Sequence, residues 1–216
     1  MKNLSVQILS LLMIISLTSC GQKVKKMDAK NPPKDLSKFS RATFASGCFW
    51  CMEGVYESVK GVEEVISGYS GGKEANPTYE QVGAHQTGHA ESVEVYYNPS
   101  VVSYATLLKV YFASQDPTQV NGQGPDHGTP YRSIIFYRTP EEKAAAEKYK
   151  SEIQKNFNKP IAAEIAAFQK FWPAEDYHQD YIQHNPDVPY VQGESIPRIK
   201  RFQKQFPELI KPDHKF

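Results

Sequence analysis

The sequence predicts an α+β domain, a two-layer sandwich in which a mixed, mostly antiparallel sheet carries helices on one face. Segments with strand and helix patterns follow one another in the order β-α-β-β-α-β-α-β, which favours a ferredoxin-like core. The chain has 216 residues, a length that suits one domain with appendages. Hydrophobic residues make up 40% and aromatic residues 12% of it, enough for a packed core.

The first strands and helix are bounded by glycine and proline. Residues 41–46 form a short apolar strand pattern that stops at Gly47. A helix is expected over 49–59, with Gly61 just past its end as a stop signal. Residues 62–69 are rich in β-branched side chains and predict a second strand, after which a polar loop follows.

The middle of the chain alternates more regularly. Residues 90–97 switch between two faces like a strand, and 103–113 repeat apolar residues at helical spacing. Residues 116–131 hold three glycines and three prolines, so we expect a long loop there. Loops of that length in a compact domain are usually functional. Residues 133–138 predict another strand.

The last part begins with a strong helix signal. Thr139 is placed to cap a helix running to about 157, with Pro140 at its first position. Residues 161–168 predict a final strand. After Trp172 the sequence is rich in proline, tyrosine, histidine and charge, so we expect a long irregular wrap with short helices.

The N-terminus has the pattern of an export signal. Lys2 precedes an apolar run over 4–17 that is too short to span a bilayer as a mature helix. Leu17-Thr18-Ser19-Cys20 resembles the bacterial lipobox, in which the cysteine is acylated. An ordinary secretory signal is the alternative. We expect a signal peptide over 1–19, lipidated Cys20 with a flexible tether over 20–38, and the folded domain over 39–216. The lipids would anchor the protein to a membrane of the bacterial cell envelope, on its periplasmic or extracytoplasmic face.

Charge and oligomeric state give weaker information. The formal net charge is +1, so nothing favours a nucleic-acid partner. We take a monomer as the default state.

The cysteines point to chemistry. The chain has three, and if Cys20 carries lipid, the domain keeps only Cys48 and Cys51. A disulfide between them closes too small a loop to restrain a domain much. Zinc would need further cysteine or histidine ligands at suitable spacing, and no second cysteine pair exists. Redox catalysis is the favoured interpretation, with a structural disulfide and a zinc site as alternatives.

Cys48 is expected where a strand turns into a helix. Its sulfur would lie near the unpaired N–H groups at the helix start, which lower a thiol's pKa and favour the thiolate. Cys51 follows one helical turn later on the same face, close enough for a disulfide after small adjustment.

Glu91 is the candidate acid. In the strand over 90–97 it shares a face with Val93, Val95 and Tyr97, which should be the buried one. Burial would raise its pKa and make it a proton donor near neutrality. Alternatively, Glu91 lies at the end of the strand, where the alternation of side chains between the two faces no longer determines burial. The other side of the strand, expected nearer solvent, carries Ser92, Glu94 and Tyr96.

Six short blocks follow one another along residues 41–190: Gly47-Cys48-Phe49-Trp50-Cys51-Met52-Glu53, Gly68-Tyr69-Ser70-Gly71-Gly72, Asn76-Pro77-Thr78-Tyr79, Gly88-His89-Ala90-Glu91, Asp126-His127-Gly128-Thr129-Pro130-Tyr131-Arg132-Ser133 and Ala174-Glu175-Asp176-Tyr177-His178-Gln179. In this order they resemble the A-type peptide methionine sulfoxide reductases. The resemblance implies an oxidoreductase that repairs methionine-(S)-sulfoxide, free or in oxidised proteins, without a bound cofactor or metal.

The resemblance also implies roles. Cys48 would attack the sulfoxide sulfur and Glu91 would protonate its oxygen, which Tyr79 and Tyr131 would hydrogen-bond. The S-methyl group would meet an aromatic wall formed by Phe49 and Trp50. Asp126, in the long loop, would order the tyrosines or a catalytic water.

Two departures from the family pattern matter. Many members use a cysteine near the C-terminus to resolve the sulfenic acid, and this chain has none after Cys51. Cys51 would therefore form a disulfide with Cys48, to be reduced by a thioredoxin-like electron donor. Pro130 stands where the family usually has glutamine, so the placement of Tyr131 is expected to differ slightly.

Two other function classes remain open from the sequence. A general dithiol–disulfide oxidoreductase would also use a Cys-x-x-Cys pair and would be indifferent to Glu91→Gln. A lipoprotein adhesion or scaffold domain would have an inert cysteine pair.

Overall fold

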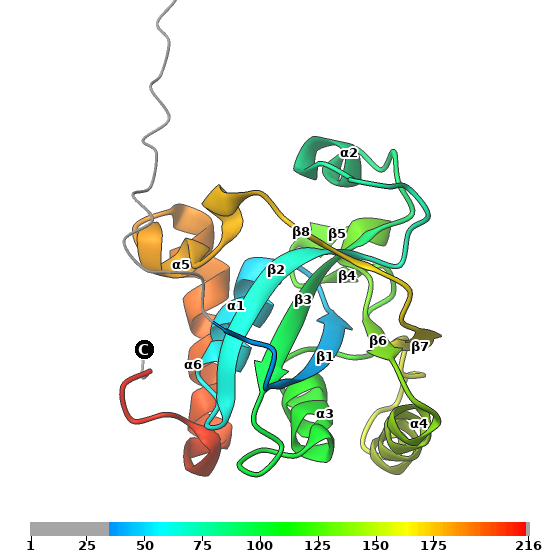
Figure 1. Ribbon diagram of the computed structural model, residues 1–216, viewed down its shortest axis with the longest axis vertical. Helices are drawn as coiled ribbons and strands as arrows, with labels where there is room; N and C mark the ends of the chain where they lie inside the picture. The colour runs from blue at the N-terminus through cyan, green and yellow to red at the C-terminus, as the bar shows by residue number, and fades with distance from the viewer. Residues whose placement is uncertain (1–34, 215–216) are drawn as a thin grey trace, which may run out of the picture. The chain divides into compact units, whose positions relative to one another are not determined.

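The computed structural model describes residues 35–214, which are built on a six-stranded sheet with the order β7-β6-β1-β3-β2-β8 (Figure 1). Its strands are β1 (Ser40–Ala45), β2 (Val62–Ser70), β3 (Ala90–Tyr97), β6 (Ile134–Tyr137), β7 (Glu164–Ala167) and β8 (Phe171–Pro173). The β6–β7 pair is parallel and the other pairs in this sheet are antiparallel. The predicted mixed, mostly antiparallel sheet is confirmed.

The main core lies between one face of the sheet and a layer of helices. These helices are α1 (Phe49–Glu57), α3 (Tyr104–Ala113), α4 (Pro140–Gln154) and α6 (Ile196–Gln205). The ring of Phe44 in β1 stacks on Tyr56 of α1 at 5.2 Å between centroids and lies 5.4 Å from Tyr111 of α3. The apolar side of β1 therefore packs against both α1 and α3, and these aromatic contacts hold the two helices on this face of the sheet.

The opposite face of the sheet is also covered, although the sequence predicted it nearer to solvent. Ser92 and Glu94 of β3 are buried there. Arg138 pairs with Glu94 at 2.6 Å and lies over the ring of Phe168, which follows β7. Phe171 of β8 lies so close to Gly68 that no side chain would fit at that glycine. The expectation for this face was wrong because the chain after β7 returns across it.

Most predicted elements are present at nearly the predicted bounds. Thr139 caps α4 by accepting a hydrogen bond from the Glu142 N–H, and the helix ends at Gln154, three residues before the expected end. The loop before β3 contains a short helix, α2 (Tyr79–Gly83), which begins with a capping box between Thr78 and Gln81. The long loop holds a small hairpin and a 3₁₀ turn, named β4 (Gly122–Gln123), β5 (Asp126–His127) and η1 (Thr129–Tyr131).

The C-terminal wrap is more regular than expected. After the 3₁₀ turn η2 (Asp176–His178) and α5 (Tyr181–His184), a π-helical segment, η3 (Val191–Ser195), continues directly into α6. Ile199 and Phe202 of α6 are buried at i,i+3 spacing, a helical pattern that the proline-rich composition concealed. The 3₁₀ turn η4 (Pro207–Leu209) follows α6.

The predicted signal peptide, Cys20 and most of the tether lie outside the described residues, so they stay predictions. Within residues 35–214, none of the helices combines the length and the apolar character needed to cross a bilayer.

Candidate active site

Cys48 lies at the turn between β1 and α1, as predicted, and is only 6% exposed. Gly47 before it has φ +68°, and a Cβ there would come within 2.5 Å of the Gln123 side chain. The Gly47 N–H donates to the Tyr131 carbonyl at 3.1 Å. Glycine at position 47 therefore lets the long loop pack directly against the cysteine turn.

Glu91 reaches the same turn from β3. Its Oε2 accepts a hydrogen bond from the Phe49 N–H, the residue after Cys48, at 3.0 Å. The side chain is 2% exposed, and this burial raises the pKa of Glu91 to about 8. The predicted parity of the strand is therefore observed, and a carboxyl group that stays protonated at neutral pH lies beside the thiol.

The expected lowering of the Cys48 pKa does not occur. Burial raises the pKa of the Cys48 thiol, and the neighbouring Cys51, Glu91 and Asp126 raise it further. The N–H of Phe49, which the helix start offers to a sulfur, is donated to Glu91 instead. The prediction failed because it assumed that the N–H groups at the helix start would stabilise the Cys48 thiolate. One of them, the Phe49 N–H, binds the buried Glu91 carboxyl group.

The negative charge of the cysteine pair is held by Cys51. The pKa of Cys51 is lowered to about 6 by its hydrogen bond with Cys48 and, against the effect of burial, by Arg198, Ser195 and Tyr190. Both cysteines are buried, and neither is in a disulfide. Their hydrogen bond places the two sulfurs in contact, as the spacing of one helical turn predicted.

Tyr79 and Tyr131 both flank the Cys48–Glu91 pair. Burial raises the pKa of each phenol, and nearby Glu91 raises both further. Tyr131 stands at the end of η1, where buried Pro130 occupies the helical turn without disturbing it. Tyr131 lies near Glu91 with proline at position 130, and a slight shift of Tyr131 relative to the family stays a prediction.

Phe49 and Trp50 belong to a larger aromatic cluster than predicted. Phe49 is fully buried, and Trp50 stacks on Tyr181 with ring centroids 3.6 Å apart. The Trp50 Nε1–H donates to Nδ1 of His178 at 3.1 Å. Burial lowers the pKa of His178, so the ring is neutral and its Nδ1 accepts. These contacts fix the Trp50 ring at the edge of the site.

Asp126 holds a tyrosine that was not predicted. Its Oδ2 accepts a hydrogen bond from the Tyr190 hydroxyl at 2.5 Å, and the Cys48 backbone N–H also hydrogen-bonds to it. The side-chain hydrogen bond of Asp126 is to Tyr190 rather than to Tyr79 or Tyr131, and a role in ordering a catalytic water stays a prediction. Asp126 instead links the long loop, the cysteine turn and the C-terminal segment.

Several residues of the C-terminal segment escaped the sequence analysis. Glu175 accepts from the Tyr69 hydroxyl at 2.8 Å and from the Tyr79 N–H at 3.0 Å, so it holds two tyrosines in place. His178 and Tyr181 support Trp50. Glu175 and His178 lie in the Ala174–Gln179 block. This block resembles the family pattern, but the sequence analysis assigned no role to its residues.

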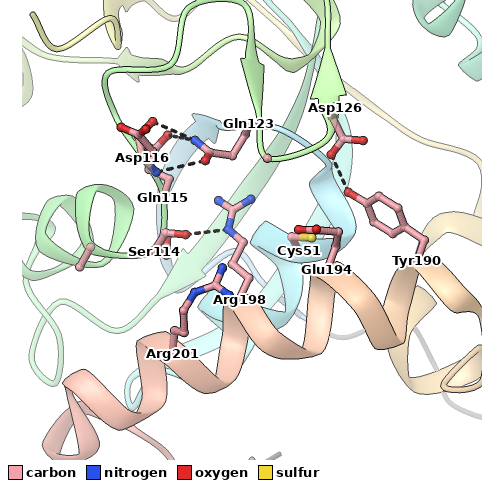
Figure 2. Close-up of a pocket in the computed structure, with 12 residues that line it drawn as sticks. Cys51, Ser114, Gln115, Asp116, Gln123, Asp126, Tyr190, Glu194, Arg198 and Arg201 are labelled. Carbon is pink, nitrogen blue, oxygen red and sulfur yellow. Dashed lines mark hydrogen bonds between the residues drawn. The ribbon is translucent and has the colours of Figure 1, made fainter. Parts of the chain in front are cut away.

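A cavity of about 290 Å³ opens beside Cys51 (Figure 2). Its walls come from the end of α3, the long loop, η3 and α6. It is lined by Cys51, Ala113, Ser114, Gln115, Asp116, Gln123, Gly124, Asp126, Tyr190, Glu194, Arg198 and Arg201. Cys48 is not among these residues.

Metal-ligating side chains do not cluster in the described part of the chain. Residues 35–214 contain no group of three or more histidine, cysteine or acidic side chains placed to hold a metal ion. The site as described offers a sulfur nucleophile, a neutral acid and phenolic donors.

Comparison with known proteins gives one consistent result. The family model of peptide methionine sulfoxide reductase matches residues 40–210. The chain is 47% identical over 174 residues to peptide methionine sulfoxide reductase MsrA 2 of Synechocystis sp., covering 79% of this chain and 81% of that protein. It is 45% identical to MsrA of Haloquadratum walsbyi, covering 78% and 97%. Among solved structures, reduced Mxr1 from Saccharomyces cerevisiae superposes with a TM-score of 0.67 at 34% identity, covering 73% and 92%.

Proposed function

The chain belongs to the peptide methionine sulfoxide reductase family and is an enzyme that reduces methionine sulfoxide, and we propose that Cys48 and Glu91 carry its reductive step. The observation that supports this most is the hydrogen bond from the N–H of Phe49, the residue after Cys48, to the Glu91 carboxyl group, because it holds the acid at the cysteine turn. The substrate is methionine-(S)-sulfoxide, in proteins or free.

In this reaction, oxygen passes from the substrate sulfur to the enzyme sulfur. Cys48 gives up its thiol proton and attacks the sulfoxide sulfur, while protonated Glu91 gives its proton to the departing oxygen. The attack forms a bond between the two sulfurs. The protonated oxygen then moves to the Cys48 sulfur as the bond between the sulfurs and the S–O bond of the substrate break, so methionine leaves and Cys48 keeps the hydroxyl as a sulfenic acid. The thiol proton restores Glu91, so the step consumes no net proton. The raised pKa of Glu91 supports this role because an ionised carboxylate has no proton to give.

The tyrosines and aromatic rings orient the substrate. Tyr79 and Tyr131 stand near Glu91 and would donate hydrogen bonds to the sulfoxide oxygen as negative charge grows on it. Phe49 and Trp50 would contact the S-methyl group, and their rings are held by Tyr79, His178 and Tyr181. Asp126 would act from a distance by holding Tyr190 and the cysteine turn.

Cys51 would resolve the sulfenic acid. Its sulfur hydrogen-bonds to Cys48 and has the lower pKa of the two. Condensation would form a Cys48–Cys51 disulfide and release water. A thioredoxin-like protein would then supply the two electrons that return the pair to thiols.

The Cys51→Ser variant should form about one methionine per enzyme and then stop recycling with a thioredoxin-like donor, because the sulfenic acid has no partner for a disulfide. A rapid-quench experiment with a mass-spectrometric count of methionine measures this. Continued recycling at the wild-type rate would show that Cys51 does not resolve the sulfenic acid of Cys48.

The direct test of the function uses purified protein lacking residues 1–20. It is offered each methionine sulfoxide epimer with dithiothreitol, and methionine is measured by mass spectrometry. We expect methionine from the S epimer only. A protein that reduced insulin-like disulfides but neither epimer would instead be a general dithiol–disulfide oxidoreductase.

We also propose that the enzyme works at the bacterial cell envelope, held to a membrane by lipids on Cys20. The lipobox-like sequence before Cys20 and the apolar run over 4–17 support this location. There the enzyme would repair exported proteins under oxidative stress.

The Cys20→Ala variant should leave the membrane fraction and appear as soluble or unprocessed protein, because it has no sulfur to acylate. Cell fractionation with immunoblotting measures the distribution, and Cys51→Ser provides a matched control that keeps the lipid site. An unchanged membrane fraction for Cys20→Ala would defeat the anchor.

A further inference from the structure

Cys51 lies against the junction of η3 and α6. Its sulfur is 3.2 Å from the Ser195 hydroxyl oxygen, and both groups are buried. Ser195 is the last residue of the π-helical segment, a kind of distortion that is frequent at functional sites. Arg198 follows one turn later on α6 and lines the same cavity as Cys51 (Figure 2).

The guanidinium group of Arg198 is fixed in place. Its Nε donates to the Ser114 carbonyl at 2.6 Å, and its two terminal nitrogens donate to the Ser46 carbonyl at 3.2 Å and the Ser46 hydroxyl at 3.3 Å. The side chain is 7% exposed. These contacts satisfy hydrogen bonds, but they come from neutral groups.

Arg198 is therefore a buried cation without a carboxylate in ion-pair contact, as far as residues 35–214 are concerned. Burying an uncompensated charge is costly, and a nearby anion offsets the cost. Arg198 lowers the pKa of two groups that line this cavity, Asp126 and Cys51, and Cys51 is the one of them that takes part in the disulfide steps.

We propose that Arg198 and Ser195 are positioning residues for the Cys51 thiolate, which is used twice in each catalytic cycle. This inference rests on the proposed function, because it assigns the groups that serve its disulfide steps.

In the first use, the Cys51 thiolate attacks the sulfenic sulfur of Cys48. A sulfur–sulfur bond forms, the S–O bond of Cys48 breaks, and the oxygen leaves as hydroxide that takes a proton to become water. Arg198 lowers the pKa of Cys51, and once the sulfur is a thiolate, the Ser195 hydroxyl at 3.2 Å would donate a hydrogen bond to it.

In the second use, Cys51 is the leaving group. A thiolate of the external dithiol attacks Cys48, the disulfide breaks, and Cys51 departs as a thiolate with the electron pair. The second thiol of the donor then releases Cys48. Because the thiol of lower pKa leaves faster, the same two residues direct the donor's attack to Cys48.

The charged and titratable groups facing Cys51 act in opposite directions. Arg198 and the hydroxyls favour its thiolate, whereas negative charge on its acidic neighbours opposes it. The titratable or charged groups around Cys51 and its cavity are Cys48, Glu91, Asp116, Asp126, Tyr190, Glu194, Arg198 and Arg201. Removing Arg198 should therefore raise the pKa of Cys51 from about 6.

The test follows two events after mixing reduced full-length enzyme with methionine-(S)-sulfoxide in the absence of reductant. Quenched samples give the methionine formed and, by alkylation and mass spectrometry, the Cys48–Cys51 disulfide. We expect the step from sulfenic acid to disulfide, measured as the delay between methionine and disulfide, to be independent of pH above about 7 in the wild type. In Arg198→Met it should be about tenfold slower at pH 7 and recover as the pH rises, if loss of the guanidinium raises the pKa of Cys51 by about two units, because a thiol whose pKa lies about one unit above the pH is about one tenth thiolate.

The companion variants separate charge from structure. Arg198→Lys keeps the charge and should keep the wild-type pH profile, while Ser195→Ala should shift the profile in the same direction as Arg198→Met. Arg201→Gln removes a charge from the same helix and cavity and should leave it unshifted. An unshifted profile in both Arg198→Met and Ser195→Ala, or a shifted one in Arg198→Lys, overturns the inference. If Arg198→Met does not fold, Ser195→Ala and Arg198→Lys decide. Absence of the first methionine in wild type would instead overturn the proposed function.

Discussion

The Cys48→Ser variant should show no measurable turnover of methionine-(S)-sulfoxide. Serine keeps the size of the side chain, but its hydroxyl is a far weaker nucleophile than a thiol and cannot carry the sulfenic acid of the next step. The measurement is methionine formation with dithiothreitol, followed long enough to detect a single equivalent per enzyme.

The matched control for this experiment is Cys51→Ser, which changes the same atom one helical turn away. It should still deliver about one methionine, so the comparison isolates the attacking sulfur from general effects on α1. If Cys48→Ser gave a first methionine and Cys51→Ser gave none, the two roles would be reversed.

The Glu91→Gln variant should slow formation of the first methionine by roughly 10²- to 10⁴-fold, the usual contribution of acid catalysis. The glutamine carbonyl can still accept the Phe49 N–H, so the local geometry is kept while the transferable proton is lost. In the wild type, the reductive step should fall as the pH rises through about 8, because Glu91 then ionises. Single-turnover rates from pH 6 to 9 measure this, and the variant should lack the fall.

Glu94→Gln provides the control for Glu91. Glu94 is a buried carboxylate of the same strand, but it points to the opposite face and pairs with Arg138 at 2.6 Å. This variant should lower stability while keeping the reductive rate and its pH profile. Equal rates for wild type and Glu91→Gln would show that the proton comes from elsewhere.

The sequence predicted what local patterns determine. The alternation in β3 placed Glu91 on the core face, and a threonine followed by proline located the start of α4. These features depend on neighbours in the chain, so one sequence is enough to find them.

The sequence did not predict what distant segments bring together. Glu94 is buried by Arg138 and Phe168, and the pKa of Cys48 is raised because Glu91 takes the Phe49 N–H. The support of Trp50 by His178 joins residues 128 positions apart. Each of these outcomes depends on tertiary contacts that no periodicity encodes.

The strand order has a consequence for biosynthesis. The central strands β1, β3 and β2 are made first, whereas the flanking strands β7 and β8 come after residue 163. A partly synthesised chain would carry the thiols of Cys48 and Cys51 beside a sheet whose edge strands are still unpaired, and unpaired edge strands readily pair with other chains. Arg198 is later still. Assembly of a competent enzyme therefore awaits a helix that is made after every strand of the sheet, and chaperone protection of the unfinished chain should matter most until then.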